Sequence, residues 1–249
     1  MIWLLPWDED AAVRHMPWAT WSLIAINVLA FLLTFMVTPA ESEAWIPHWG
    51  LTPANLHWYQ FLTSDFVHGG WFHLIGNMLF LLVFGDNVED AFGPIPFLLL
   101  YFLGGLAGDL MWVHANPSMD IPSVGASGCI SALAGAYAVL FFSSTIGVRL
   151  MFFVFNLRTF YFGAPWVLLF WFGGDIYRTF ASHGVMGDEP GVNFVAHGAG
   201  FAFGLAVAVI AILVGVMHRY DILSEGHDWF GYWPPSLETP RRAKVRRRR

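Results

Sequence analysis

The chain has little charge and almost no cysteine, and each shortage excludes a class of protein. Charged side chains make up 12% of its 249 residues, whereas a soluble globular domain carries about 25% to wet its surface. A hydrophobic content of 57% also excludes a disordered chain, which lacks apolar side chains. The single cysteine, Cys129, excludes an internal disulfide framework and a cysteine-rich zinc site.

Aromatic residues are abundant, and apolar stretches recur along the chain. Aromatics form 18% of the residues, with 13 Trp and 24 Phe, which is typical of lipid contact and interfacial anchoring. A helix that crosses a bilayer needs about 20 mostly apolar residues. Six stretches approach or meet that length: 18–37, 71–85, 92–113, 124–142, 163–177 and 192–216. The sequence therefore predicts an all-α membrane protein whose fold is a bundle of six transmembrane helices.

Charged residues suggest where these segments begin and end. The acidic residues at positions 86, 89 and 90 should end the second helix, and Arg149 and Arg158 should keep residues 150–157 at the membrane interface. We expect an N-terminal cytoplasmic segment over residues 1–17, a six-helix domain over 18–216 and a basic cytoplasmic tail over 217–249. The N-terminus lacks the basic start and small-residue cleavage site of a signal peptide, so we expect it to be retained.

Basic residues also predict the orientation, because they collect at the cytoplasmic ends of membrane spans. With six spans, one side of the membrane holds 11 of the 12 Lys and Arg residues, and the other holds only Arg178. Both termini should then be cytoplasmic, in a plasma membrane of bacterial type. We expect residues 241–249, the basic block, to set the orientation or contact anionic lipid rather than bind nucleic acid.

Three polar clusters lie in or beside the apolar stretches, where a polar side chain needs a partner or a function. In the first, His73 and Asn77 stand four residues apart on one face of the second helix, just after His68. The fourth helix contains the second cluster, Gly125-Ala-Ser-Gly128. The sixth helix contains the third, Ala196-His-Gly-Ala-Gly200.

Small residues line one face of the fourth helix and one face of the sixth. The stripes are Ser127, Ser131 and Gly135 on the fourth, and His197, Gly200, Gly204 and Ala208 on the sixth. Such stripes let membrane helices approach until their backbones nearly touch. Packing along them would bring the Ser127 hydroxyl near the His197 imidazole, toward the outer face. Because a serine hydroxyl needs an adjacent base to act as a nucleophile, this pair indicates a serine hydrolase.

The same region offers groups that could stabilise an oxyanion. His73 and Asn77 could donate hydrogen bonds to the developing negative charge. The backbone N–H groups at the start of the fourth helix could do the same, and the helix dipole favours negative charge there. Gly128, which follows the serine, would let an acyl group approach the backbone closely.

Other interpretations remain open on the residues alone. Ser127 could bond the backbone of its own helix, and the polar pair on the second helix could be a clamp between helices. The three histidines of these clusters could bind zinc, although no HExxH motif or suitably spaced carboxylate supports a metal site. A proton-coupled transporter would account for Asp109 and Asp175, which lie within apolar stretches.

Taken together, the motifs resemble those of the rhomboid family of intramembrane serine proteases. The resemblance runs from about residue 59 to residue 204 and has four parts. Residues 59–78 are similar to the end of the family's first loop and the start of its second helix, and residues 84–90 to the turn after it. Residues 125–128 are similar to the GxSG serine motif, and residues 196–200 to the histidine motif. This is not the G-x-S-x-G elbow of soluble hydrolases.

The resemblance implies an acyl-enzyme mechanism with Ser127 as nucleophile and His197 as general base. It implies His73, Asn77 and the main-chain N–H groups around Ser127 and Gly128 as oxyanion stabilisers. It also implies the fifth span, with the loop Arg178–Gly191, as a gate for the substrate. The implied substrates are single-span membrane proteins, cut near the outer end of their helix. No metal or cofactor is implied. A catalytically silent relative that only captures membrane helices is an alternative, although such proteins typically lack the serine or the histidine.

Four positions depart from the family pattern. Gln60 stands where many relatives have Arg, and Ser131 where some have a Tyr that stacks on the histidine. Ala199 replaces a frequent Gly, and the sequence offers no explanation for Asp109 in the third helix. None of these departures removes a catalytic atom.

Overall fold

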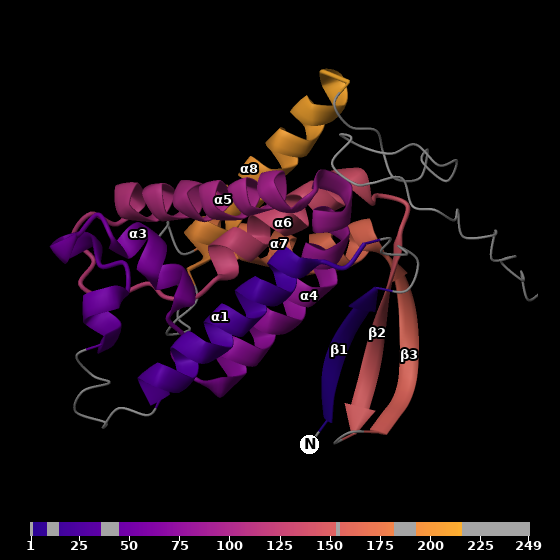
Figure 1. The fold of residues 1–249 in the computed structure, drawn as a ribbon, viewed down its shortest axis with the longest axis horizontal. Helices are drawn as coiled ribbons and strands as arrows, with labels where there is room; N and C mark the ends of the chain where they lie inside the picture. Colours follow the sequence, from indigo (N-terminus) through magenta and orange to yellow (C-terminus); the bar gives the residue numbers. More distant parts are fainter. Residues whose placement is uncertain (1, 9–14, 36–44, 153–154, 182–192, 216–249) are drawn as a thin grey trace, which may run out of the picture.

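The computed structural model describes residues 2–8, 15–35, 45–152, 155–181 and 193–215. In that part of the chain, six apolar helices form a bundle (Figure 1). They are α1 (Trp18–Phe35), α4 (Trp71–Phe92), α5 (Pro94–Ala115), α6 (Ser127–Leu140), α7 (Ala164–Ala181) and α8 (Phe194–Leu213). The loop between α1 and α4 carries the short helices η1 (Pro53–Asn55), α3 (Gln60–Thr63) and η2 (Ser64–Phe66). The protein is therefore mostly helical.

Among the described residues, three helices are long and apolar enough to cross a membrane. These are α4, α5 and α8. The other three have shorter apolar segments, over Trp18–Thr34, Ser127–Leu140 and Ala164–Gly174. Each lies at the position of a predicted span, but the described part of the chain does not contain six full-length spans.

The second helix does not end at the acidic residues, so that prediction was wrong. α4 continues to Phe92 because its Glu89 is buried and bonded. The Glu89 carboxylate accepts hydrogen bonds from the Ala19 N–H (2.9 Å), the Thr20 N–H (2.7 Å) and the Thr20 hydroxyl (2.8 Å). These N–H groups are the unpaired donors at the start of α1, where the helix dipole favours a negative charge.

The prediction of an all-α fold was also wrong, because three strands form an antiparallel sheet. The strands are β1 (Ile2–Asp8), β2 (Thr145–Phe152) and β3 (Phe155–Gly163), in the order β1-β2-β3. Residues 150–157, apart from 153 and 154, belong to the β2–β3 hairpin, and their position at the membrane interface stays a prediction. A short apolar run fits a strand as readily as a helix, and β-branched and aromatic residues, frequent in β2 and β3, favour strands.

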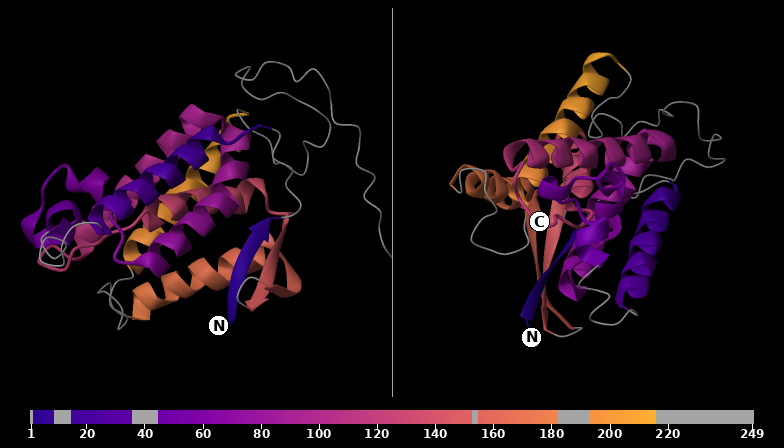
Figure 2. Two further views of the ribbon diagram at one scale, coloured as in Figure 1. Left: turned by 60° about the horizontal axis from the view of Figure 1, so that its bottom comes forward. Right: turned by 90° about the vertical axis from the view of Figure 1, so that its left-hand side faces the viewer.

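The sheet links the beginning of the chain to the segment between α6 and α7. β1 pairs with β2 from Ile2–Phe152 to Asp8–Ile146, although four of the bundle helices lie between these strands in sequence. In Figure 1 and in the left view of Figure 2, the sheet and the loop that carries α3 lie at opposite ends of the bundle. Because β1 and β2 are paired, both lie on the same side of any membrane that the bundle spans. The four helices between them must therefore cross that membrane an even number of times.

Candidate active site

Ser127 is the first residue of α6, at the end of the bundle that carries the α3 loop. The chain reaches it through Gly125, whose φ of +112° is a conformation that side-chain-bearing residues rarely adopt. The Gly125 N–H donates to the Ser64 carbonyl oxygen (2.9 Å), so η2 holds the chain just before the serine. Ser127 itself is half-buried.

His73 and Asn77 of α4 face this turn. A Cβ atom on Gly125 would lie 2.6 Å from the His73 Nε2 atom and 3.5 Å from the Asn77 Nδ2 atom. Only glycine therefore leaves room for the His73 ring beside the backbone that precedes Ser127, and Asn77 lies within van der Waals distance of the same position. The structure thus brings the predicted α4 pair to the predicted serine motif.

The hydrogen bonds of His73 indicate which ring nitrogen carries its proton. The Gly69 N–H donates to His73 Nδ1 at 3.4 Å, so a neutral ring has its hydrogen on Nε2. That nitrogen is the one beside Gly125. Asn77 donates from Nδ2 to the His73 carbonyl oxygen (3.1 Å), and its second amide hydrogen remains for another acceptor. Both side chains therefore present a donor near the start of α6.

His197 lies in the first turn of α8, which packs against α6. A Cβ on Gly200, three residues further along, would overlap the Gly128 carbonyl oxygen, so the backbones of the two helices touch just beyond Ser127 and His197. The His197 ring is half-buried, packs edge-on to the Phe194 ring (centroids 6.3 Å apart) and interacts electrostatically with His73. Ser127 and His197 thus lie at the same end of two closely packed helices.

Further along, part of the α6 face that contacts α8 is shifted by one position from the predicted stripe. Side chains at Gly204 and Gly135 would overlap the carbonyl oxygens of Ala132 and Phe201, respectively. α6 therefore presents Gly128 and Ala132 to α8 in place of Ser127 and Ser131, whereas Gly135 of the predicted stripe does lie in the contact. Ser131 instead donates to the Ser127 carbonyl oxygen (2.7 Å), the backbone bond that serine commonly makes in a helix.

Sequence reasoning missed a pair of residues that ties the starts of α6 and α8 together. The Asn193 side chain caps α8, because its Oδ1 accepts from the Ala196 N–H (3.0 Å). Its Nδ2 donates to the Ser123 hydroxyl (2.9 Å), four residues before Ser127. An Asn directly before an apolar run is a common helix N-cap signal, but nothing in the sequence pairs it with Ser123.

The α3 loop is held against the same segment. Leu51 and Ser123 form an isolated antiparallel bridge, with N–H to carbonyl oxygen distances of 2.9 Å in both directions. Gln60, at the position where many rhomboids have Arg, is fully buried. Its amide donates to the Pro47 and His48 carbonyl oxygens (3.4 and 3.3 Å) and accepts from the His57 N–H (3.0 Å). The amide thus anchors the loop with hydrogen bonds to its backbone.

His68 lies beside the site but does not complete a metal centre. Its ring is 5.1 Å from the His73 ring, centroid to centroid, and neither of its nitrogens has a hydrogen-bond partner in the described part of the chain. Burial lowers the pKa of His68 to about 4, so the ring is neutral near pH 7. The described residues include no group of three or more His, Cys, Asp or Glu side chains suited to a metal ion.

Of the two aspartates considered for a transporter, only Asp109 has a side chain among the described residues. Asp109 is buried in α5, close enough to Asp65 of η2 to interact electrostatically. Asp175 belongs to α7, but its side chain lies outside the described residues. Of the loop Arg178–Gly191, expected to form part of the gate, residues 178–181 belong to α7 and residues 182–191 lie outside the described part of the chain.

Comparison with known proteins matches the sequence of this chain to one family. A model of the Rhomboid domain matches residues 55–214, which include all the predicted site residues. YdcA, a rhomboid-family protein of Bacillus subtilis (strain 168), is 32% identical over 141 residues, which are 54% of this chain and 69% of YdcA. The rhomboid protease GluP of the same bacterium is 30% identical over 224 residues, 85% of this chain but only 42% of GluP.

A plant relative shows that similarity to the family extends to members without activity. The inactive RHOMBOID-like protein 8 of Arabidopsis thaliana is 34% identical over 88 residues, 35% of this chain and 24% of that protein. Because the domain match covers well over half of the chain and contains both the serine and the histidine motif, the chain belongs to the rhomboid family.

Proposed function

We propose that this chain is an active intramembrane serine endopeptidase that cleaves transmembrane segments of other membrane proteins. The observation that carries the proposal is the convergence of three helices. The first turns of α6 and α8, which hold Ser127 and His197, lie at one end of closely packed helices, and His73 and Asn77 of α4 face the same turn. A nucleophile, a base and two hydrogen-bond donors are what acyl transfer requires.

In the proposed reaction, the Ser127 hydroxyl oxygen attacks the carbonyl carbon of the scissile peptide bond. His197 takes the hydroxyl proton and then gives it to the departing amine as the C–N bond breaks. Water, activated by His197, hydrolyses the resulting ester and regenerates the serine. His73 Nε2, the Asn77 amide and the N–H groups around Gly128 donate to the oxyanion formed in both steps. No metal or cofactor takes part.

We propose six membrane crossings, with residues 1–17 and 217–249 on the cytoplasmic side of a bacterial-type plasma membrane. The pairing of β1 with β2 supports an even number of crossings by α1, α4, α5 and α6. Because the sheet and the α3 loop lie at opposite ends of the bundle (Figure 1), a cytoplasmic sheet puts Ser127 toward the outer face. Substrates would be single-span proteins, cut near the outer end of their helix.

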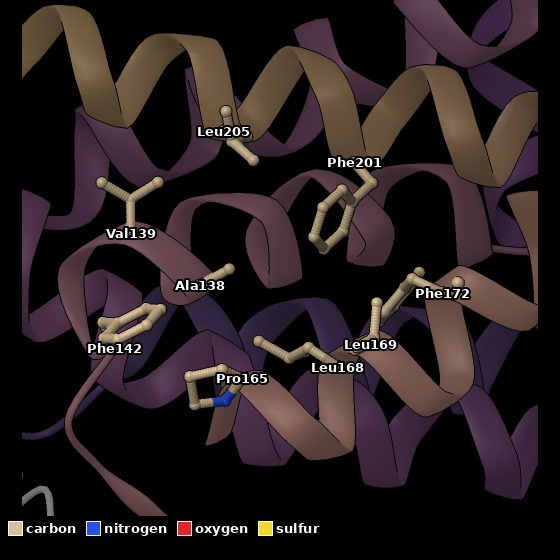
Figure 3. Close-up of a pocket in the computed structure, with 10 residues that line it drawn as sticks. Ala138, Val139, Phe142, Pro165, Leu168, Leu169, Phe172, Phe201 and Leu205 are labelled. Atoms are coloured by element: carbon tan, nitrogen blue, oxygen red, sulfur yellow. The ribbon is translucent and has the colours of Figure 1, made fainter. Parts of the chain in front are cut away.

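We propose α7 as the element that moves to admit the substrate. An apolar cavity of about 490 Å³ lies between α6, α7 and α8, and Figure 3 shows Leu168 and Phe172 of α7 beside it. At the edge of this cavity, the Phe172 ring stacks on the Phe201 ring of α8, with centroids 5.0 Å apart. A second cavity, of about 350 Å³, separates α7 from β2 and β3. Because voids forgo dispersion contacts, a helix bordered by two of them loses little packing when it shifts.

Cleavage of a reconstituted substrate tests the proposed function. Purified protein and a panel of single-span membrane proteins are placed in liposomes, and products are identified by mass spectrometry. We expect cleavage by the wild type, none by Ser127→Ala or His197→Ala, and a rate about 100-fold lower when His73 or Asn77 becomes Ala, the effect typical of losing one oxyanion donor. Substrate capture without any product from the wild type would instead support a silent rhomboid relative.

A further inference from the structure

Three polar side chains from three different elements meet behind the candidate nucleophile. Asp65 of η2, Asp109 of α5 and Cys129 of α6 are all buried, with 3%, 8% and 0% of their surfaces exposed. A Cβ on Gly105 would overlap the Cys129 sulfur and lie 3.4 and 3.5 Å from the two Asp65 carboxylate oxygens. Asp109 stands one helical turn beyond Gly105 on the same face of α5.

The three side chains interact directly. The Cys129 thiol donates a hydrogen bond to the Asp65 carboxylate, and Asp109 interacts electrostatically with Asp65 and Cys129. Tyr101, one turn before Gly105, adds a buried hydroxyl that interacts with Asp65 and Cys129 and with Asn27 of α1. Among the described residues, no basic side chain takes part in these interactions. The helix α8 also packs against α5, and its one titratable side chain is His197.

The cluster is connected to Ser127 on both sides. Cys129, bonded to Asp65, stands two residues after Ser127 in the first turn of α6. Gly125, two residues before Ser127, donates its N–H to the carbonyl oxygen of Ser64, the neighbour of Asp65. η2 therefore holds the serine turn through one side-chain bond and one backbone bond.

A charge on Asp65 would be poorly compensated in these surroundings. Burial raises the pKa of Asp65 to about 7, although the bond from the Cys129 thiol lowers it. Asp109 Oδ2 is buried without a hydrogen-bond partner in the described part of the chain, and an unpaired buried carboxylate is costly. Ionisation of Asp65 therefore puts a negative charge where neighbouring groups offer only the thiol and, from Tyr101, a hydroxyl.

We propose, resting on the protease function proposed above, that Asp65 is a positioning residue for Ser127. With its proton bound, Asp65 holds the first turn of α6 in place through Cys129. Loss of the proton strengthens the bond from the Cys129 thiol but leaves a poorly compensated buried charge, which draws water into the cluster, loosens the packing around the turn and slows attack by Ser127. The protease is then more active in acidic than in alkaline conditions, for a reason that lies outside the Ser–His pair.

The rate of Ser127 labelling by a fluorophosphonate probe tests this inference. Rates are measured from pH 6 to pH 8 in detergent for the wild type, for Asp65→Asn, whose amide cannot ionise, and for Asp120→Asn as control. Asp120 is exposed in the loop before α6. We expect the wild-type rate divided by the Asp65→Asn rate to fall about tenfold between pH 6 and pH 8. The protonated fraction of a single carboxyl group with a pKa of about 7 falls by the same factor over this range. Asp120→Asn should follow the wild type.

A pair of Cys129 variants tests the link to α6 and decides the question if Asp65→Asn does not fold. Removing the thiol donor in Cys129→Ala should raise the pKa of Asp65 and move the fall in rate to higher pH. The stronger hydroxyl donor in Cys129→Ser should move it to lower pH. A ratio of wild-type to Asp65→Asn rates that does not change with pH, or equal midpoints in both Cys129 variants, would overturn the inference.

Failure of the proposed function gives a different result. In that case the probe labels the wild type and Ser127→Ala equally at every pH, and the melting temperature becomes the readout for the cluster. The melting temperature of the wild type should fall relative to that of Asp65→Asn as the pH rises from 5 to 8, because only the wild type then buries a charge at position 65. A constant difference would overturn the role of Asp65 whether or not the protein is a protease.

Discussion

Gly200 of α8 lies so close to Gly128 of α6 that any side chain at position 200 would overlap the Gly128 carbonyl oxygen. This contact sets the separation of the two helices one residue beyond Ser127 and three residues beyond His197. The distance between the candidate nucleophile and its base therefore depends on the absence of a single methyl group.

The first prediction concerns this contact. Gly200→Ala should force the helices apart and lower the free energy of unfolding by about 1–3 kcal/mol, as overpacking typically does. Fluorophosphonate labelling should slow at the same time. Thermal unfolding in detergent measures the first effect. The control is Gly76→Ala in α4, because a Cβ at Gly76 meets no atom within 4 Å. Equal stability of the two variants would contradict the packing argument.

The second prediction separates the two bonds made by Asn193. Asn193→Ala should cost about 1 kcal/mol of stability through loss of the α8 cap and should also slow labelling. Ser123→Ala removes only the bond between the Asn193 amide and the Ser123 hydroxyl, so it should slow labelling with a smaller loss of stability. Asn193→Asp keeps a side-chain acceptor for the Ala196 N–H and serves as the matched control for the cap. Wild-type labelling rates in Ser123→Ala would exclude a positioning role for this bond.

The third prediction concerns pH and His68. Because burial lowers the pKa of His68 to about 4, the unfolded chain binds a proton between about pH 6.5 and pH 4 that the folded protein does not. Stability from this group is thus fully present above about pH 6.5 and is lost as the pH falls through 4, by about 3 kcal/mol in total. His68→Gln should remove this acid-side loss.

The measurement is the melting temperature of His68→Gln relative to the wild type at pH 4.5 and 6.5. Asp65 has the opposite sign over much of the same range, because its raised pKa makes stability fall as the pH rises. The wild-type curve alone is therefore uninformative, and the difference between variant and wild type is needed. His114→Gln, at an exposed position near the end of α5, is the control. An unchanged difference at the two pH values would count against a neutral, buried His68.

The fourth prediction separates access of the substrate from catalysis. Ala138→Leu should partly fill the cavity between α6, α7 and α8 and hold α7 in place. Cleavage of a transmembrane substrate should then slow several-fold, while labelling by the small probe stays near the wild-type rate. Ala202→Leu, at an exposed position of α8, is the matched control. Loss of probe labelling in Ala138→Leu would mean that the substitution disturbs the site rather than the movement of α7.

The sequence predicted the positions of the six helices because unbroken apolar stretches have few alternatives in a membrane protein. It also indicated where His73, Asn77, Ser127 and His197 stand, because each is a polar residue in the first half of such a stretch. It could not predict β1, since pairing of residues 2–8 with residues 146–152 is a long-range contact without a local pattern. It missed the continuation of α4 through Glu89, because the partner donors of Glu89 are backbone groups of α1.

The departures from the family pattern were visible in the sequence, but their meaning was not. Asp109 stood out as a charge in an apolar stretch. Asp65 and Cys129 did not, because each is unremarkable alone. Only the fold brings η2, α5 and α6 together around Gly105. Similarly, Gln60 was recognised as a substitution for Arg, but the carbonyl groups that it bonds were not.

The most direct test of the central claim is the mass of the protein after reaction with a fluorophosphonate. We expect one adduct per wild-type chain, located on Ser127 by peptide mass spectrometry. No adduct should form on Ser127→Ala, and adduct formation should be strongly slowed in His197→Ala. An equal yield of adduct on the wild type and on Ser127→Ala would contradict the account, because the reactive group would then not be the hydroxyl at the start of α6.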